Sequence, residues 1–184
     1  RAKPSPAEVS HVAEQLLHEA IGPHGATHII EHDRFHNIII TARGRGLAKG
    51  QSGLPLAASM AVASAANALS RKALNGFFQR IAFCHTAIST VPFAPDFNTQ
   101  TVTLSEGNLI PALKASGAIP LLMQCEASIP GATSGPFWDG GIIDYHFSLT
   151  NSDTDGLILY PHFSDLLIPG WFDKMLPWRA QLRP

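Results

Sequence analysis

The sequence predicts an α/β fold in which a mostly parallel sheet is flanked by helices. Apolar runs without polar alternation occur along the chain, and such runs are typical of strands buried on both faces of a parallel sheet. Segments with helical spacing alternate with these runs. The chain has 184 residues, of which 45% are hydrophobic and 15% are charged. This composition fits one globular domain with a sizeable core, so we treat residues 1–184 as a single domain.

Helices are predicted where capping residues precede apolar residues at helical spacing. Residues 5–8, Ser-Pro-Ala-Glu, form a capping box with proline at the first helical position, and Gly22-Pro23 ends this helix. Residues 54–76 indicate an alanine-rich helix that ends in basic residues. A third helix begins at residue 105 or 108 and ends before Gly117.

Strands are predicted where β-branched or apolar residues form short runs between turn residues. The predicted strands are His36–Ala42, Arg80–His85, Thr99–Leu104, Leu121–Cys125 and Gly156–Tyr160. The tail after the last strand is rich in tryptophan, phenylalanine and proline, and we expect it to wrap back over the core. Functional groups of such folds gather at the carboxyl ends of strands, so the loops there are the first places to look for a site.

Composition limits the possible partners and the compartment. The net charge of −1 argues against nucleic-acid binding, which normally requires a basic face. Cys84 and Cys125 lie far apart in apolar surroundings, which predicts buried free thiols and a reducing compartment. The first twenty residues lack the apolar region of a secretory signal. Together these features predict a cytoplasmic protein, with peripheral membrane contact left open.

Three stretches have alternative interpretations. His28, His32 and His36 are spaced four apart, but no cysteine accompanies them, so solvated or hydrogen-bonded histidines are favoured over a metal site. Residues 43–50 form a basic, glycine-rich loop that could cradle a phosphate or lipid headgroup, although a solvated connection is favoured. The phenylalanines of residues 91–97 could line a pocket, touch a membrane or pack in the core.

The stretch most indicative of chemistry is residues 137–145, in which Asp139 lies between an aromatic pair and a glycine pair. Gly140 and Gly141 would permit a sharp turn, tolerate positive φ and leave space beside the carboxylate. Such an acid is held by backbone geometry and suits a role as a base. By itself the stretch also fits a tight turn between two strands.

A second segment makes the stretch more specific. Residues 113–120 contain Ala-Ser-Gly-Ala-Ile-Pro, and Asp139-Gly140-Gly141 follows about twenty residues later. Together these segments resemble the second half of patatin-like phospholipases, and residues 156–163 and 169–174 resemble a bacterial subgroup of that family. The resemblance implies a serine acyl hydrolase of lipid esters, without metal or cofactor, in which Asp139 completes a Ser-Asp dyad.

The first half of the family's motifs is absent from this chain. Patatin-like enzymes carry a glycine-rich oxyanion loop and a G-x-S-x-G nucleophile elbow, and no serine here has glycine on both sides at those positions. Ser52 comes nearest, but Leu54 occupies the second glycine position and a long loop separates Ser52 from the preceding strand. We therefore expect the C-terminal part of a patatin-like domain, whose partner is the N-terminal half, and which is inactive alone.

Two further residues near the turn receive other roles. Asp144 is interpreted as structural, bonding backbone near the site, and His146 as a surface or core histidine in preference to a pocket residue. The main alternative function is a non-catalytic binding or interaction domain that keeps the scaffold, with Asp139 bonded to its own turn. A metal-dependent hydrolase built on the N-terminal histidines is the weakest hypothesis.

Overall fold

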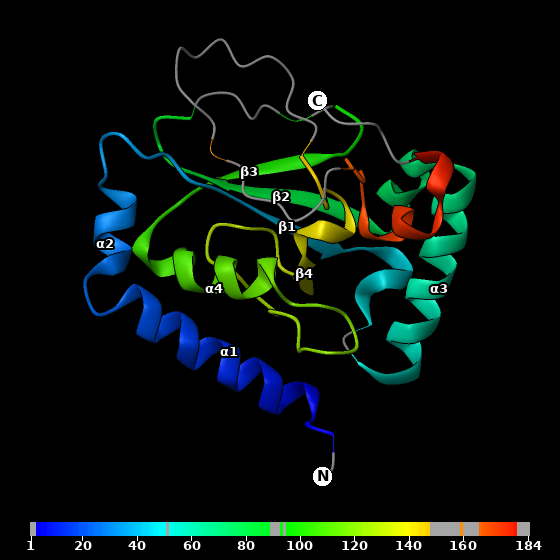
Figure 1. The fold of residues 1–184 in the computed structure, drawn as a ribbon, viewed down its shortest axis with the longest axis horizontal. Helices are drawn as coiled ribbons and strands as arrows, with labels where there is room; N and C mark the ends of the chain where they lie inside the picture. Colours follow the sequence, from blue (N-terminus) through cyan, green and yellow to red (C-terminus); the bar gives the residue numbers. More distant parts are fainter. Residues whose placement is uncertain are drawn as a thin grey trace.

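The computed structural model describes residues 3–50, 52–88, 93, 95–147, 159 and 166–179. In this part of the chain, helices cover both faces of a four-stranded sheet (Figure 1). The α-helices are α1 (Pro6–Ile21), α2 (Gly25–Ile30), α3 (Gly53–Leu69) and α4 (Glu106–Ser116). The strands are β1 (Ile38–Gly44), β2 (Phe78–Cys84), β3 (Thr99–Thr103) and β4 (Phe137–Asp139). Short 3-10 helices are η1 (Gly46–Lys49), η2 (Arg71–Gly76), η3 (Gly140–Ile142), η4 (Trp171–Met175) and η5 (Pro177–Arg179).

The sheet is mixed, with strand order β3-β2-β1-β4. β1 is antiparallel to both β2 and β4, and β2 and β3 are the parallel pair. The predicted α/β class with flanking helices is confirmed, whereas the prediction of a mostly parallel sheet is wrong. The error has a physical cause: a central strand covered on both faces is continuously apolar whichever way its neighbours run.

β1 is the centre of the packing because its two faces contribute to different cores. Ala42 packs with Trp138 and with residues of α3 and η2 on one face. Ile39 packs with Phe137 and the buried side of α4 on the other face. The side chains of successive strand residues point to opposite faces, so one strand can join both cores.

The predicted helix starts are confirmed by their capping contacts. In α1 the Ser5 amide donates to Glu8 Oε2 at 2.6 Å, and the Glu8 amide donates to Ser5 Oγ at 3.3 Å. At α4 the Ser105 amide donates to Asn108 Oδ1 at 2.8 Å. The predicted helix over 54–76 is shorter than expected, because Ser70 is extended (φ −157°, ψ 125°) and separates α3 from η2.

The strand predicted over Leu121–Cys125 is absent, and this prediction is wrong. Leu121 has φ of 70°, and the amides of Leu122 and Met123 donate back to the carbonyl of Ile119. A left-handed residue directly after Pro120 closes a turn, which the apolar composition of the segment conceals. The strand predicted over Gly156–Tyr160 lies outside the described residues except for Leu159, which is exposed.

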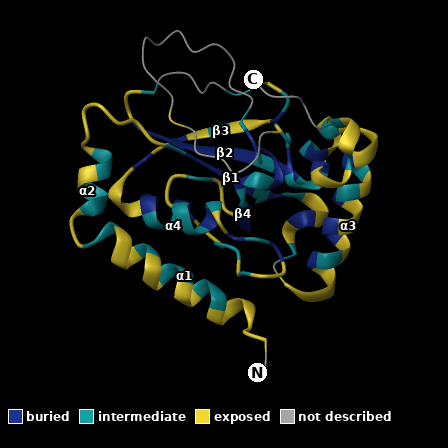
Figure 2. Cartoon of the chain, viewed as in Figure 1, coloured by how far each residue is buried: buried dark blue, intermediate teal, exposed yellow. Residues whose placement is uncertain are grey.

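α1 lies on the outside of α4, away from the sheet, and has no buried residue (Figure 2). Ser10 Oγ accepts a hydrogen bond from the Gln124 amide at 2.9 Å, and Glu14 pairs with Lys114 at 3.1 Å. At the other end of the chain, Trp171 packs against the core on the α3 side of the sheet. The expectation that the tail wraps over the core is confirmed at Trp171 and Phe172.

Both cysteines are free thiols, as predicted; Cys84 is buried, whereas Cys125 is only half-buried. Burial raises the pKa of Cys84 to about 11, so this thiol stays protonated at neutral pH. Among the described helices, none has the length and apolarity needed to cross a bilayer.

Candidate functional site

Asp139 is the last residue of β4 and the first residue of the turn that follows. Its amide donates to the carbonyl of Ala118 at 3.0 Å, and it lies opposite Thr41 of β1. The backbone then leaves the strand direction, and Oδ1 of Asp139 accepts a hydrogen bond from the Gly141 amide at 2.7 Å. The Gly141 amide thereby fixes the carboxylate at the start of η3, while the backbone of Asp139 is held by the Ala118 carbonyl and by pairing with β1.

The two glycines provide space beside Asp139, as expected from the sequence. A Cβ on Gly140 would lie 2.3 Å from the carbonyl oxygen of Ile40, so only glycine allows the turn to lie against β1. A Cβ on Gly141 would lie 3.0 Å from Oδ1 of Asp139. Neither glycine has positive φ, so the turn depends on their small size and not on left-handed backbone.

A cavity of about 340 Å³ opens beside the carboxylate. Its volume is near the lower end of the range found for small-molecule sites. Most of the lining is apolar or glycine, and it comes from β1, α4 and the turn after β4. The lining residues are Ile38, Ile39, Ile40, Leu113, Ser116, Asp139, Gly140, Gly141, Asp144, Tyr145 and Phe147.

The environment of Asp139 favours a proton-accepting role. Burial raises the pKa of its carboxyl, while the Gly141 amide and the charge of Lys174 act in the opposite direction. Oδ1 has the hydrogen bond from Gly141, and Oδ2 has no hydrogen-bond partner within the described ranges. A fixed carboxylate with one unoccupied oxygen and a raised pKa is suited to take a proton from a hydroxyl group.

The structure places two residues near Asp139 that the sequence did not indicate. Thr41 is fully buried opposite Asp139, and its hydroxyl has no partner in the described part of the chain. Lys174 Nζ lies 3.7 Å from the centroid of the Tyr145 ring, which lines the cavity. The register of β1 and β4 could not be known in advance, and Lys174 is distant in sequence, so no local signal marked these residues.

Asp144 lines the same cavity, but its carboxylate is occupied. Arg80 donates to both of its oxygens, Nε to Oδ2 and Nη2 to Oδ1, each at 2.7 Å. Both side chains are buried, and Arg71 lies 3.8 Å from Oδ1. The structural role expected for Asp144 is supported, although its partner is a guanidinium group and not the backbone.

The ion pair of Asp144 belongs to a larger, partly buried cluster that joins distant segments. Arg71 and Arg80 both pair with Asp96, at 3.2 and 3.3 Å. Arg71 also pairs with the fully buried Asp173 at 3.3 Å, and Arg179 does so at 3.2 Å. Three cations and three anions thus tie β2, η2, η4 and η5 to the segment after the Asp139 turn.

Two other residues considered from the sequence, Ser52 and His146, are not among those that line the cavity of Asp139. Ser52 is exposed before the start of α3 and does not line the cavity of Asp139. Ser116 lines the cavity, but its hydroxyl donates to the Leu113 carbonyl at 2.8 Å. His146 is buried, as a core histidine would be, and its Nδ1 accepts from the Ile168 amide at 2.8 Å.

The basic loop and the histidines have structural contacts. The Arg43 guanidinium donates to the Ser134 carbonyl and to Gln79, so this side chain is engaged in contacts within the fold. His32 Nδ1 accepts backbone hydrogen bonds, and the ring of His36 stacks on that of His85 with centroids 4.5 Å apart. Within the described residues, no three histidine, cysteine or acidic side chains lie together as metal ligands would.

Of the phenylalanine loop, Phe97 is buried in the core and residues 91, 92 and 94 lie outside the description.

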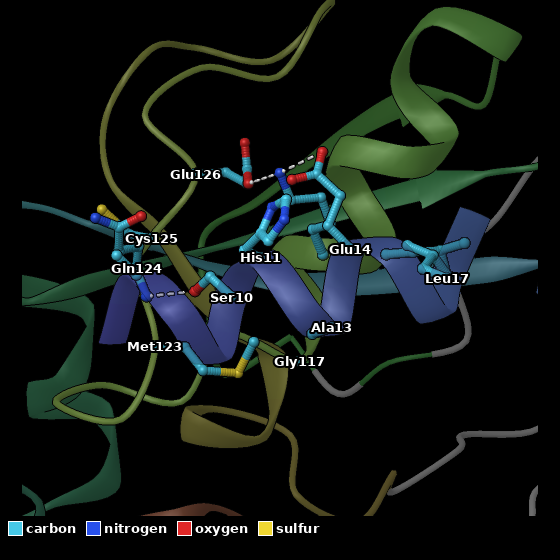
Figure 3. Close-up of a pocket in the computed structure, with 13 residues that line it drawn as sticks. Ser10, His11, Ala13, Glu14, Leu17, Gly117, Met123, Gln124, Cys125 and Glu126 are labelled. Carbon is cyan, nitrogen blue, oxygen red and sulfur yellow. Dashed lines mark hydrogen bonds and ion pairs between the residues drawn. The ribbon is translucent and has the colours of Figure 1, made fainter. Parts of the chain in front are cut away.

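A second cavity, of about 450 Å³, lies between α1 and α4 (Figure 3). Its main charges pair with one another: Lys114 Nζ lies 3.1 Å from Glu14 and 2.8 Å from Glu126. The groove is therefore explained by the docking of α1, and the cavity of Asp139 is the stronger candidate site.

Comparison of the chain with protein-family models, curated proteins and solved structures gave no significant match. The geometry around Asp139 and the sequence resemblance are therefore the features of this chain that indicate a function.

Proposed function

We propose that this chain supplies the catalytic aspartate of a patatin-like serine acyl hydrolase that acts on lipid or other esters. The observation that carries the proposal is the state of Asp139. One carboxylate oxygen is fixed by the Gly141 amide, and the other has no partner in the described structure and belongs to a side chain lining an apolar cavity.

The chemistry follows from the weakness of a serine hydroxyl as a nucleophile at neutral pH. A serine becomes reactive when a base removes its proton during attack on the ester carbonyl. The raised pKa of Asp139 favours this proton transfer. Attack releases the alcohol and leaves an acyl-enzyme, which water then cleaves to a carboxylic acid. The apolar side chains of Ile38, Leu113 and Phe147 suit the acyl chain of the ester.

The serine itself would come from the other half of the domain. β4 pairs with β1 from Thr41 to Arg43, and Gly140 lies against Ile40, so the outer edge of β1 has no strand partner in the described structure at residues 38 and 39. Open edges of this kind accept further strands. Residues 38–40 also line the cavity, so a strand added at this edge would lie next to Asp139.

A non-catalytic binding domain is the second candidate. The contact that favours it is the same hydrogen bond from Gly141, because an aspartate that caps its own turn has a sufficient structural reason to be present. The two functions differ in the role of Oδ2 of Asp139, which catalysis needs and the turn does not.

A fluorophosphonate probe distinguishes these functions, because it labels serines that an adjacent base activates. The natural polypeptide that carries this chain is compared with its Asp139→Asn variant, which keeps an acceptor for Gly141 but no base. We expect a loss of labelling rate of at least about a hundredfold, in line with the contribution of general bases. Asp33→Asn, which changes an exposed aspartate, is the matched control. Equal labelling of Asp139→Asn and the wild type would overturn the proposal.

A further inference from the structure

We propose that the end of α3 together with η4 and η5 forms a surface that binds anionic lipid bilayers. We call it the η4–η5 surface, and its members are Leu69, Lys72, Lys174, Met175 and Trp178. The inference rests on the proposed function for the ester substrate. It adds that this substrate is presented to the protein in a bilayer.

Large apolar side chains are exposed on this surface. Leu69, Met175 and Trp178 have exposed fractions of 89%, 84% and 71%. Arg179, next to Trp178, donates to the carbonyl of Ala68 at 3.2 Å, which brings η5 to the end of α3 (Figure 1). Exposed apolar residues gathered in this way are typical of interaction sites.

The segment that presents these residues is held firmly by buried contacts. Asp173 is buried and accepts a hydrogen bond from Asn67 of α3 at 2.6 Å, in addition to its arginine partners. Trp171 and Phe172 of the same segment pack against the core. Met175 and Trp178 are therefore exposed from a segment with fixed anchors, and ordinary fraying of a chain end does not account for their exposure.

The exposed charges of this surface are positive. Lys72 and Lys174 are exposed, and neither makes an ion pair within the described ranges. The neighbouring acids Asp96 and Asp173 are paired with Arg71, Arg80 and Arg179. Lysines beside an exposed tryptophan and aliphatic groups match a bilayer interface, where the apolar groups enter the headgroup region and the ammonium groups pair with anionic lipids.

Lys174 connects this surface to the candidate site. Its ammonium lies 3.7 Å from the centroid of the Tyr145 ring, and Tyr145 lines the cavity with Asp139. A bilayer that contacts η4 would therefore lie near the cavity. An ester lipid could reach the cavity from the interface without crossing bulk water, which is the advantage of binding at this position.

Vesicle flotation tests the inference without any ester turnover, so its result is independent of the labelling experiment. The probes are vesicles of phosphatidylcholine, with and without phosphatidylglycerol. We expect binding to the mixed vesicles and at least about tenfold weaker binding to phosphatidylcholine alone. Lys72→Gln/Lys174→Gln and Met175→Ser/Trp178→Ser should each lower the affinity for mixed vesicles by about tenfold or more.

Matched controls change the same kinds of residue elsewhere. Val12→Ser/Leu16→Ser removes two apolar side chains of α1 that are 52% and 60% exposed, and Lys3→Gln/Arg34→Gln removes two exposed cations. Both control variants should bind as the wild type does. Equal effects of test and control variants, or no binding of the wild type to mixed vesicles, would overturn the inference.

A spectroscopic measurement separates a direct contact from an indirect effect. Trp138 is fully buried and Trp171 is half-buried, so quenching by brominated lipid should come from Trp178. We expect quenching in the wild type and its loss in Trp178→Phe. Binding without any quenching would show that another part of the protein contacts the lipid headgroups, and this result would also overturn the inference.

Discussion

Asp139 and Asp144 are five residues apart and line the same cavity, yet their carboxylates are in opposite states. Asp144 accepts two hydrogen bonds from the buried Arg80 guanidinium. Asp139 has one hydrogen bond, from the Gly141 amide, and burial raises its pKa. The partners of a carboxylate, and not its position in a cavity, therefore separate a structural acid from a candidate base.

The contacts of Asp144 also help to hold the turn that presents the carboxylate of Asp139. The turn after Asp139 is bordered by a cluster that spans β2, η2, η4 and η5. Because Asp144 is anchored by Arg80, the segment between the two acids has a fixed end on each side. The buried ion pairs thus give the Asp139 turn a defined position, at the cost of desolvating several charges.

The largest effect is expected from Arg80→Ala, which leaves the buried carboxylate of Asp144 without its main partner. Removing one member of a buried ion pair typically costs about 3–5 kcal/mol. Denaturant unfolding measures this loss, and Arg34→Ala is the control because Arg34 is exposed. A loss in Arg80→Ala no larger than in the control would contradict a structural role for the Asp144 pair.

A smaller loss is expected from Gly140→Ala, because the new Cβ would lie 2.3 Å from the carbonyl oxygen of Ile40. Overpacking of this kind costs about 1–3 kcal/mol. Gly117→Ala is the matched control, since a Cβ there meets nothing within 4 Å. Thermal unfolding of both variants measures the contrast. Equal midpoints would mean that the turn does not need the close approach to β1.

The smallest effect on folding stability is expected from Asp139→Asn, and this effect is a gain, whereas the two preceding variants lose stability. Because the folded chain raises the pKa of Asp139, it holds this proton more tightly than the unfolded chain, so stability falls as pH rises through the raised pKa. The variant lacks this loss and should be more stable than the wild type near neutral pH. The difference should shrink as pH falls toward the ordinary aspartate range. Thermal unfolding across pH measures it, and a less stable variant at neutral pH would count against the assigned environment.

Local features of this fold could be predicted from the sequence, whereas long-range features could not. The capping residues at Ser5 and Ser105 predicted their helices because a cap is satisfied within one turn of backbone. The prediction of a mostly parallel sheet is wrong, since an apolar run does not indicate in which direction its neighbours run. The turn at Leu121 was missed because left-handed backbone there has no glycine to signal it.

The candidate site shows the same difference between local and long-range features. The motif identified Asp139 and its two glycines because they are adjacent in the chain. It could not identify Thr41 or Lys174, which reach the site through strand register and through the docking of η4. Nor could it reveal that Arg80 is the partner of Asp144, because that pair joins residues on separate elements.

The most direct test of the difference between the two acids is an NMR titration of the carboxyl carbon of Asp139 in this chain. We expect an apparent pKa above the ordinary aspartate value of about 3.9, because burial raises the pKa of this carboxyl. The amide of Gly141 should report the same transition, because it donates to Oδ1. A pKa at or below the ordinary value, or a Gly141 amide that does not follow the titration, would contradict a partly desolvated and unpaired carboxylate at this position.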